Sequence, residues 1–169
     1  MHHGFPSMTL RPSVFLAIAL GLMSLHPTTT YSQEIERMTA VAKGSFTVEM
    51  APQGEPEVAD GVALGRMALN KAFVGDLDAV GVGQMLTALT PTKGSAGYVA
   101  IERVSGSLHG RKGSFVFQHS GLMNEGARQL SISVVPGSGT GELAGLAGTF
   151  TLVIVDGEHH YQFEYSLPE

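Results

Sequence analysis

The chain has 169 residues and a formal net charge of −5, with 22 glycines and no cysteine. This length fits a single domain, and the lack of cysteine excludes disulfide bonds and a lipid-anchored cysteine. No basic cluster is larger than Arg111–Lys112, so the charge argues against nucleic-acid binding. Abundant glycine and few charged residues favour strands and tight turns over helices.

Residues 1–32 are typical of a secretory signal peptide. Arg11 precedes an apolar run at 14–25 that is too short to span a bilayer comfortably, and small residues follow at 30–32. Removing this segment takes away Arg11 alone, which leaves a net charge of −6 and no stable membrane span. We expect a secreted or periplasmic protein with a short linker at 33–40 and one β-barrel domain at 41–169. The alternative is a cytoplasmic protein whose translation starts at Met38.

Alternation of apolar and polar residues predicts strands along the rest of the chain. The third strand has an apolar phase of Val80, Val82 and Leu86 that also contains Gln84. The acidic stretch 55–60 is expected to be a solvated loop. The inward residues expected in the first two strands are Ala42, Gly44, Phe46, Val48, Met50, Met67, Leu69 and Phe73. The eight predicted strands cover residues 42–50, 65–74, 80–86, 98–108, 114–123, 129–135, 149–155 and 159–167.

The stretch 136–167 contains the strongest local signals. Asp156–Gly157 between two β-rich runs predicts a tight hairpin, because both central residues of such a turn need positive φ. Five glycines between 137 and 148 allow only a single helical turn, expected at residues 142–146. The pattern Gly139-x-Gly141-x-x-Ala144 matches a loose dinucleotide fingerprint, but a strand follows it instead of the required helix. We therefore interpret this stretch as a corner loop.

Eight strands of this size, separated by turn signals, predict an all-β fold. An eight-stranded antiparallel sheet closes most naturally into a β-barrel, whose interior is filled by side chains or by one small ligand. A β-sandwich is the alternative, because the period of two is the same in both.

Polar residues within apolar phases are the main pointers to chemistry. Glu102 shares the phase of Tyr98 and Val104, whereas Arg103 alternates with it. Lys71 and His119 also follow apolar neighbours in phase. A buried charge is costly unless paired, so Glu102 is expected to pair with Lys71 or Arg103. A glutamate in such surroundings could also act as a general acid or base beside His119, although a purely structural polar network is the simpler interpretation.

The histidines and serines do not form a recognisable metal or nucleophile site. His159 and His160 are adjacent and point to opposite faces of a strand, and no pair has the spacing that places two ligands on one face. Ser114 and Ser120 lack a nucleophile-elbow context, and no phosphate-binding loop is present. We therefore expect no metal and no cofactor.

Four motifs between residues 38 and 167 are distinctive. They are Ala-Lys-Gly-Ser-Phe at 42–46, Ser-Gly-Ser-Leu-His-Gly-Arg-Lys-Gly-Ser-Phe at 105–115, Pro-Gly-Ser-Gly-Thr-Gly-Glu-Leu-Ala-Gly-Leu-Ala-Gly at 136–148 and Asp-Gly-Glu-His-His-Tyr at 156–161. Together they resemble a bacterial family known only as a domain of unknown function, which itself looks like the allene oxide cyclase and dirigent barrels. The resemblance implies an eight-stranded barrel that often self-associates. In the plant relatives it implies cofactor-free handling of apolar molecules, but no catalytic residue is carried over.

Three functional hypotheses follow. The first is a barrel that binds a small apolar or aromatic molecule, with Lys71, Glu102 and His119 as polar groups. The second is a cofactor-free isomerase or cyclase in which Glu102 and His119 are the candidate catalytic residues. The third is a filled barrel that acts as a structural module, and a homo-oligomer fits all three. The aromatic residues expected to line the ligand site are Phe115, Phe117, Tyr161, Phe163 and Tyr165.

Overall fold

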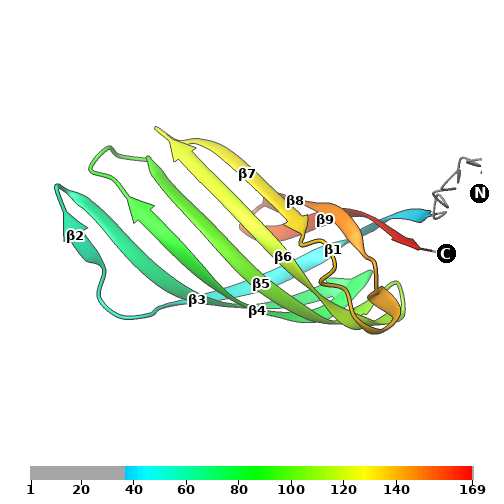
Figure 1. Cartoon of the computed structure of the whole chain (residues 1–169). Coiled ribbons are helices and arrows are strands. Elements are labelled where there is room, and N and C mark those ends of the chain that lie inside the picture. Colours follow the sequence, from blue (N-terminus) through cyan, green and yellow to red (C-terminus); the bar gives the residue numbers. More distant parts are fainter. Residues whose placement is uncertain (1–36, 169) are drawn as a thin grey trace, which may run out of the picture. The chain divides into compact units, whose positions relative to one another are not determined.

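The chain folds into one antiparallel sheet that closes on itself (Figure 1). The computed structural model describes residues 37–168, and the predicted signal peptide at 1–32 lies outside them. One short 3-10 helix, η1 (Gly141–Leu143), lies where the helical turn at 142–146 was predicted. The strands are β1 (Arg37–Pro52), β2 (Glu57–Ala59), β3 (Val62–Gly75), β4 (Leu77–Leu89), β5 (Ala96–Leu108), β6 (Arg111–Asn124), β7 (Ala127–Val134), β8 (Ala147–Val155) and β9 (Glu158–Pro168).

Strand β1 closes the barrel. Its residues 37–46 pair with β9 and its residues 44–52 pair with β3, so eight strands form a ring. This pairing confirms the predicted eight-stranded antiparallel barrel and excludes the sandwich. The predicted solvated loop at 55–60 contains the additional strand β2, which pairs with the start of β3. Strand β1 begins at Arg37, within the segment expected to be a linker.

The seam between β7 and β8 is the weakest in the ring. Only Ser133 and Thr149 form a register pair there, whereas β5 and β6 pair along their whole length. The backbone groups of β7 before Ser133 and of β8 after Thr149 are therefore without ladder partners on these edges. The two strands diverge toward the end of the barrel that holds the β6–β7 and β8–β9 turns.

Four hairpins turn on a residue followed by glycine, both with positive φ. Asp156 and Gly157 have φ of 52° and 86°, which confirms the predicted tight turn. The other three pairs are Asp60–Gly61, His109–Gly110 and Glu125–Gly126. In each case glycine takes a conformation that a side chain would strain, and the turn then sets the register of the strands on either side.

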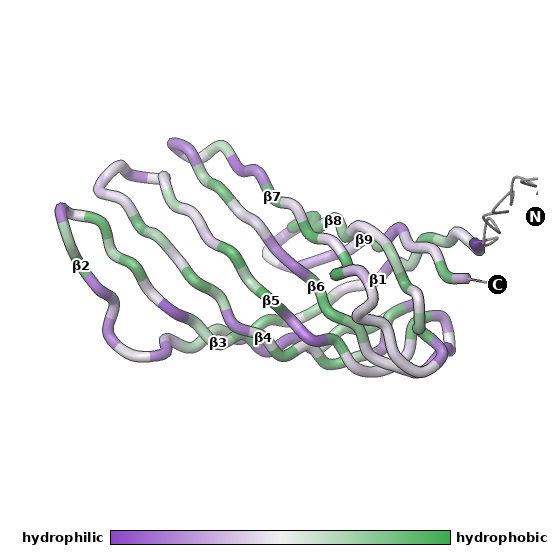
Figure 2. Tube along the Cα trace, viewed as in Figure 1, coloured by the Kyte–Doolittle hydropathy of each residue, from purple (hydrophilic) through white to green (hydrophobic). Residues whose placement is uncertain are grey.

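Aromatic rings fill the middle of the barrel. Phe117 lies with its ring centroid 4.9 Å from that of Phe115, 5.1 Å from that of Phe150 and 5.3 Å from that of Phe163. Phe163 is fully buried. The alternation of apolar and polar residues along the strands is visible in Figure 2. The predicted inward phases of β1 and β3 are confirmed by burial, since the register partners Phe46 and Phe73 are 7% and 2% exposed.

The two ends of the barrel differ. At the end with the β3–β4 and β5–β6 turns, Leu77, Leu108 and the loop residues Leu143 and Leu146 are at most 1% exposed, and we call this the closed end. At the opposite end, the inward-phase residues become exposed, and we call this the open end. The exposed inward residues there are Met50, Leu89, Met123, Leu130 and Ile154.

Strand β4 has its apolar phase outside. Val80, Val82 and Leu86 are 56–59% exposed, and the inward positions near the middle of the strand are glycines, Gly81 and Gly83. Together with outward residues of β3, β5 and β6 these side chains form an exposed apolar wall, which we call the outer face. Its large apolar residues are Leu64, Val74, Val80, Val82, Leu86, Val99, Ile101 and Leu122.

Candidate functional site

Three of the predicted polar residues meet inside the barrel, and we call Lys71, Glu102 and His119 the Glu102 cluster. Lys71 comes from β3, Glu102 from β5 and His119 from β6. The Lys71 Nζ atom donates a hydrogen bond to Glu102 Oε2 at 2.8 Å. The side chain of Glu102 is fully buried, and those of His119 and Lys71 are 5% and 9% exposed. Arg103, the other predicted partner of Glu102, lies outside the barrel and is exposed.

Strand register brings the three residues together. Lys71 pairs with Gly81, Glu102 pairs with Gly83, and His119 pairs with Ala100 on the next strand. All of these positions face inward, and β4 presents only glycine between β3 and β5 at this level. Lys71 and Glu102, which are 31 positions apart in sequence, therefore meet across a strand that carries no side chain at this level.

Glycine at position 81 is required by the buried carboxylate. A Cβ atom there would overlap Glu102 Oε1 and lie 3.1 Å from Phe73 Cε2. Because both neighbours are packed in the core, neither has room to move. We expect Gly81→Ala to lower the free energy of unfolding by about 1–3 kcal/mol, the usual cost of overpacking a core.

Urea unfolding measures this loss, and the control is Gly157→Ala. A Cβ at Gly157 meets nothing within 4 Å, but this glycine has φ of 86°, so its variant reports backbone strain without overlap. Equal stability of Gly81→Ala and the wild type would contradict the geometry of the cluster.

One oxygen of Glu102 is left without a partner. His119 Nε2 lies 2.9 Å from Glu102 Oε2, the same atom that Lys71 contacts, although the ring N–H is not aligned for a good hydrogen bond. Both contacts therefore fall on Oε2. Among the described residues, no group donates a hydrogen bond to the buried Oε1. A buried carboxylate oxygen without a donor is costly, and such atoms call for an explanation.

Glu102 is ionised despite its burial. Desolvation raises the pKa of this carboxyl, but the approach of His119 and the charge and hydrogen bond of Lys71 together outweigh desolvation. The pKa of Glu102 therefore lies below its ordinary value of 4.5. The Lys71 ammonium is further held 4.9 Å from the centre of the Phe46 ring and 5.6 Å from that of Phe73. Such cation–π contacts keep the cation in place next to the carboxylate.

The lowered pKa predicts an acid-dependent stability. The folded state binds a proton at Glu102 less readily than the unfolded state, so this group stabilises the fold above its unfolded pKa. That contribution is lost as the pH falls from about 5 through the lowered folded value. We expect Glu102→Gln to show a shallower decline of stability with acid than the wild type. Urea unfolding at a series of pH values measures both slopes, and parallel slopes would contradict the prediction.

The sequence of this chain matches a known family. The family model is described as a protein of unknown function (DUF3224), and it matches residues 42–165. The chain belongs to the DUF3224 family. A crystal structure of a DUF3224 protein of unknown function from Shewanella oneidensis MR-1 is 48% identical. The match covers 78% of this chain and 99% of the Shewanella chain, with a TM-score of 0.73. No curated protein matches.

In this DUF3224 barrel, the aromatic residues predicted to line a ligand site lie in the packed core. They are 0–4% exposed and pack against one another. The Tyr161 hydroxyl accepts a hydrogen bond from the backbone N–H of Leu77 at 2.9 Å, and the Tyr165 hydroxyl lies 2.7 Å from His109 Nδ1. Both hydroxyls thus bond to residues of the closed end. The five residues are Phe115, Phe117, Tyr161, Phe163 and Tyr165.

A second polar cluster was missed by the sequence analysis. His109 Nε2 lies 3.5 Å from Asp76 Oδ2, and the same carboxylate oxygen accepts a hydrogen bond from the backbone N–H of Lys43 at 2.8 Å. Through Tyr165, this cluster joins the β3–β4 turn, the β5–β6 turn and β9. The positive φ of His109, at 46°, could be anticipated from the glycine that follows it. Its contacts at the closed end indicate a structural role for the DUF3224 fold.

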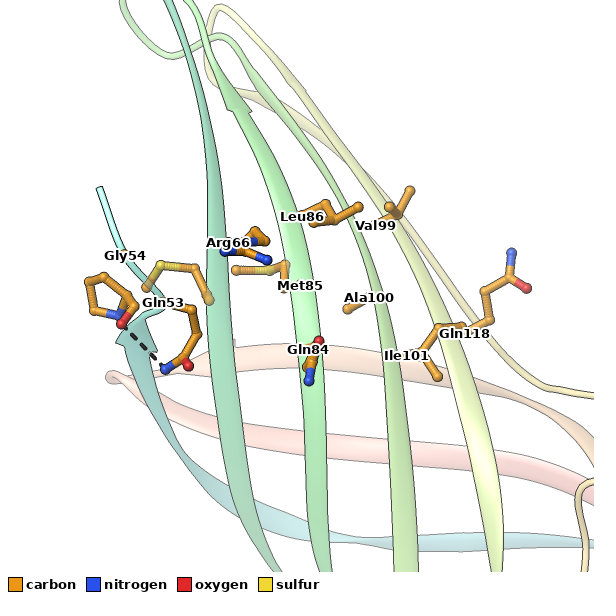
Figure 3. Close-up of a pocket in the computed structure, with 12 residues that line it drawn as sticks. Gln53, Gly54, Arg66, Gln84, Met85, Leu86, Val99, Ala100, Ile101 and Gln118 are labelled. Atoms are coloured by element: carbon orange, nitrogen blue, oxygen red, sulfur yellow. Dashed lines mark hydrogen bonds between the residues drawn. The ribbon is translucent and has the colours of Figure 1, made fainter. Parts of the chain in front are cut away.

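The outer face of the barrel is hollowed by two neighbouring grooves, of about 790 Å³ and 680 Å³. Arg66, Leu86 and Val99 border both, and Figure 3 shows the first groove with Gln84, Ile101 and Gln118 along it. Within residues 37–168, no three histidine, aspartate or glutamate side chains gather as metal ligands. No helix in this part of the chain is long and apolar enough to cross a membrane.

Proposed function

We propose that the protein binds a small apolar molecule at the open end of the barrel. One polar group of the molecule donates a hydrogen bond to Glu102. The observation that supports this most is the buried, ionised Glu102, whose Oε1 has no donor among the described residues. A hydroxyl or N–H group of a ligand is the donor that this oxygen lacks. The proposed ligand is therefore an apolar molecule that carries a hydrogen-bond donor.

Apolar side chains at the open end support the same proposal. Strand pairing places Val48 next to Lys71, Met67 next to Met85, and Leu130 next to Gly121, all in the inward phase. Several of these side chains are incompletely buried, in contrast to those at the closed end. Methionine is flexible and polarisable, and it adapts to apolar ligands of varied shape. By register these residues lie beside the Glu102 cluster or on its open-end side, and Lys71 is the most exposed member of the cluster.

The ionisation of Glu102 favours binding over acid catalysis. A carboxylate whose pKa is lowered carries no proton to deliver at neutral pH. The second candidate, a cofactor-free isomerase or cyclase similar to allene oxide cyclase, then requires Glu102 to accept a proton or to stabilise a developing positive charge. Because the lowered pKa makes Glu102 a weak base, its charge supports stabilisation of a positive charge more than proton abstraction.

Binding of N-phenylnaphthylamine tests the proposal. This neutral aromatic amine carries one N–H donor and becomes fluorescent in apolar surroundings. We expect wild-type protein to bind it and Glu102→Gln to bind it about tenfold or more weakly, because a hydrogen bond to a charged group is worth about 1.5–3 kcal/mol. Equal binding by Glu102→Gln would contradict the role of the carboxylate.

A matched pair on β8 tests the location without touching the cluster. Ile154 is in the inward phase and 47% exposed, whereas its neighbour Val153 points outward and is 52% exposed. We expect Ile154→Lys to weaken binding of the amine and Val153→Lys to leave it unchanged. Equal affinities of the two variants would contradict a site at the open end. Native mass spectrometry of protein purified from its own host identifies a natural ligand that stays bound.

We also propose that residues 1–32 direct the protein out of the cytoplasm. The apolar run at 14–25 behind Arg11 supports this. A full-length protein with a C-terminal tag is expected in the periplasm or medium, shortened at its N-terminus. Retention in the cytoplasm at full length would contradict the proposal and would favour a start at Met38.

A further inference from the structure

The barrel has one polar outer wall and one apolar outer wall. Outward positions of β1 and β9 carry polar side chains such as Lys43, Gln162 and Glu164, as expected for a wall in water. On the opposite wall, formed by β3–β6, many of the outward side chains are large and apolar. Six of these on β4–β6 are each more than half exposed: Val80, Val82, Leu86, Val99, Ile101 and Leu122.

These apolar side chains are contiguous. Leu86 pairs with Val99, and Gln84 pairs with Ile101 across the β4–β5 ladder. Cross-strand partners lie side by side on one face, so the apolar side chains extend over two strands, with Gln84 and Arg103 among them, and reach β6 at Leu122. Monomeric proteins rarely expose contiguous apolar patches of more than a few hundred Å². The exposed apolar residues of the outer face therefore indicate a binding surface.

We propose that the outer face binds a second copy of this chain, related by a two-fold axis. The area fits such a partner. Four strands of 13–14 residues, about 4.8 Å apart with a rise of about 3.3 Å per residue, present about 800 Å². A stable interface hides roughly 800 Å² on each partner. The two grooves provide depressions for side chains of the second copy, and Figure 3 shows the first of them.

The charges on this wall also favour a second copy. Arg66 borders both grooves, and Glu55 and Glu57 border the second groove beside it. A face that carries both signs can complement itself under two-fold symmetry, in which the same surface is used by both copies. A membrane surface fits less well, because the centre of the face has only Arg66 and Arg103 as cations and the whole chain is acidic.

Sedimentation velocity of the full chain tests the interface through two matched variants. Val99 on the outer face and Val153 on β8 have nearly the same exposure, 51% and 52%. We expect the wild type to have the mass of two chains. Val99→Lys is expected to raise the dissociation constant of the dimer by roughly thirtyfold or more, the effect of losing a central contact. Val153→Lys is expected to leave the dissociation constant unchanged.

Three results would overturn the inference. The first is a wild-type mass of one chain, and the second is an equal effect of Val99→Lys and Val153→Lys. The third is a wild-type monomer with a bound lipid that the Val99→Lys variant does not bind. This result would show that the outer face binds lipid instead of a second copy. Both variants keep residues 1–36, so self-association through that segment affects them equally. Circular dichroism of both variants establishes that neither is unfolded.

Discussion

Glu102→Gln is expected to lower the free energy of unfolding by about 3–5 kcal/mol, the cost of removing one partner from a buried ion pair. The substitution keeps the size of the side chain and removes its charge. The Lys71 ammonium, 9% exposed, then has no counter-charge, because Glu102 is its only salt-bridge partner in the described part of the chain. Urea unfolding at neutral pH measures the loss.

Replacement of the whole cluster separates its structural part from its functional part. A buried ion pair replaced by apolar residues of similar volume is often neutral or stabilising by about 1–4 kcal/mol. We therefore expect Lys71→Met, Glu102→Leu and His119→Leu combined to be more stable than Glu102→Gln alone. The combined variant is also expected to lose binding of N-phenylnaphthylamine. A combined variant as unstable as Glu102→Gln would contradict our account of the pairing.

Phe163→Ala is expected to lower the free energy of unfolding by about 3–5 kcal/mol, the usual effect of truncating a buried phenylalanine. Phe163 is fully buried, and its ring centroid lies 5.3 Å from that of Phe117 and 5.4 Å from that of Tyr165. These rings come from strands on both sides of the barrel, so the cavity left by the truncation cannot close without moving several of them. Thermal and urea unfolding measure the effect.

The matched variant is Phe163→Leu. It keeps most of the apolar volume and loses only the ring contacts, so we expect a clearly smaller loss than for alanine. A Phe163→Ala variant within about 1 kcal/mol of the wild type would show a loosely packed interior. That result would contradict the filled middle of the barrel. It would instead favour a ligand site in a deep interior cavity.

The strands and most inward phases could be predicted because their alternation is regular. In β9, Tyr161, Phe163 and Tyr165 share a phase that the structure places inside. The Asp156–Gly157 turn could also be predicted, because only a few residue pairs accept positive φ at both positions. Closure into a barrel followed from the number of strands, since a closed sheet leaves no free edges.

The orientation of β4 could not be predicted in the same way. A period of two separates two phases but does not say which is inside, and apolar content is then the only guide. In β4 this guide misleads: the apolar phase lies outside, because the inward position 81 must carry no side chain to admit Glu102. The presence of Glu102 rather than Arg103 in the interior was equally undecided. Tertiary pairing with Lys71 decides it, and such pairing is not visible in local sequence.

The most direct test of the account is a carbon-13 NMR titration of the Glu102 side-chain carboxyl, with and without N-phenylnaphthylamine. The account predicts that the pKa of Glu102 lies below its ordinary value of 4.5 and that the amine shifts the Glu102 signal. The exposed Glu164 serves as the control and should not respond to the amine. A pKa of Glu102 above its ordinary value, or a Glu102 signal that the amine does not shift, would contradict a paired carboxylate that binds the ligand.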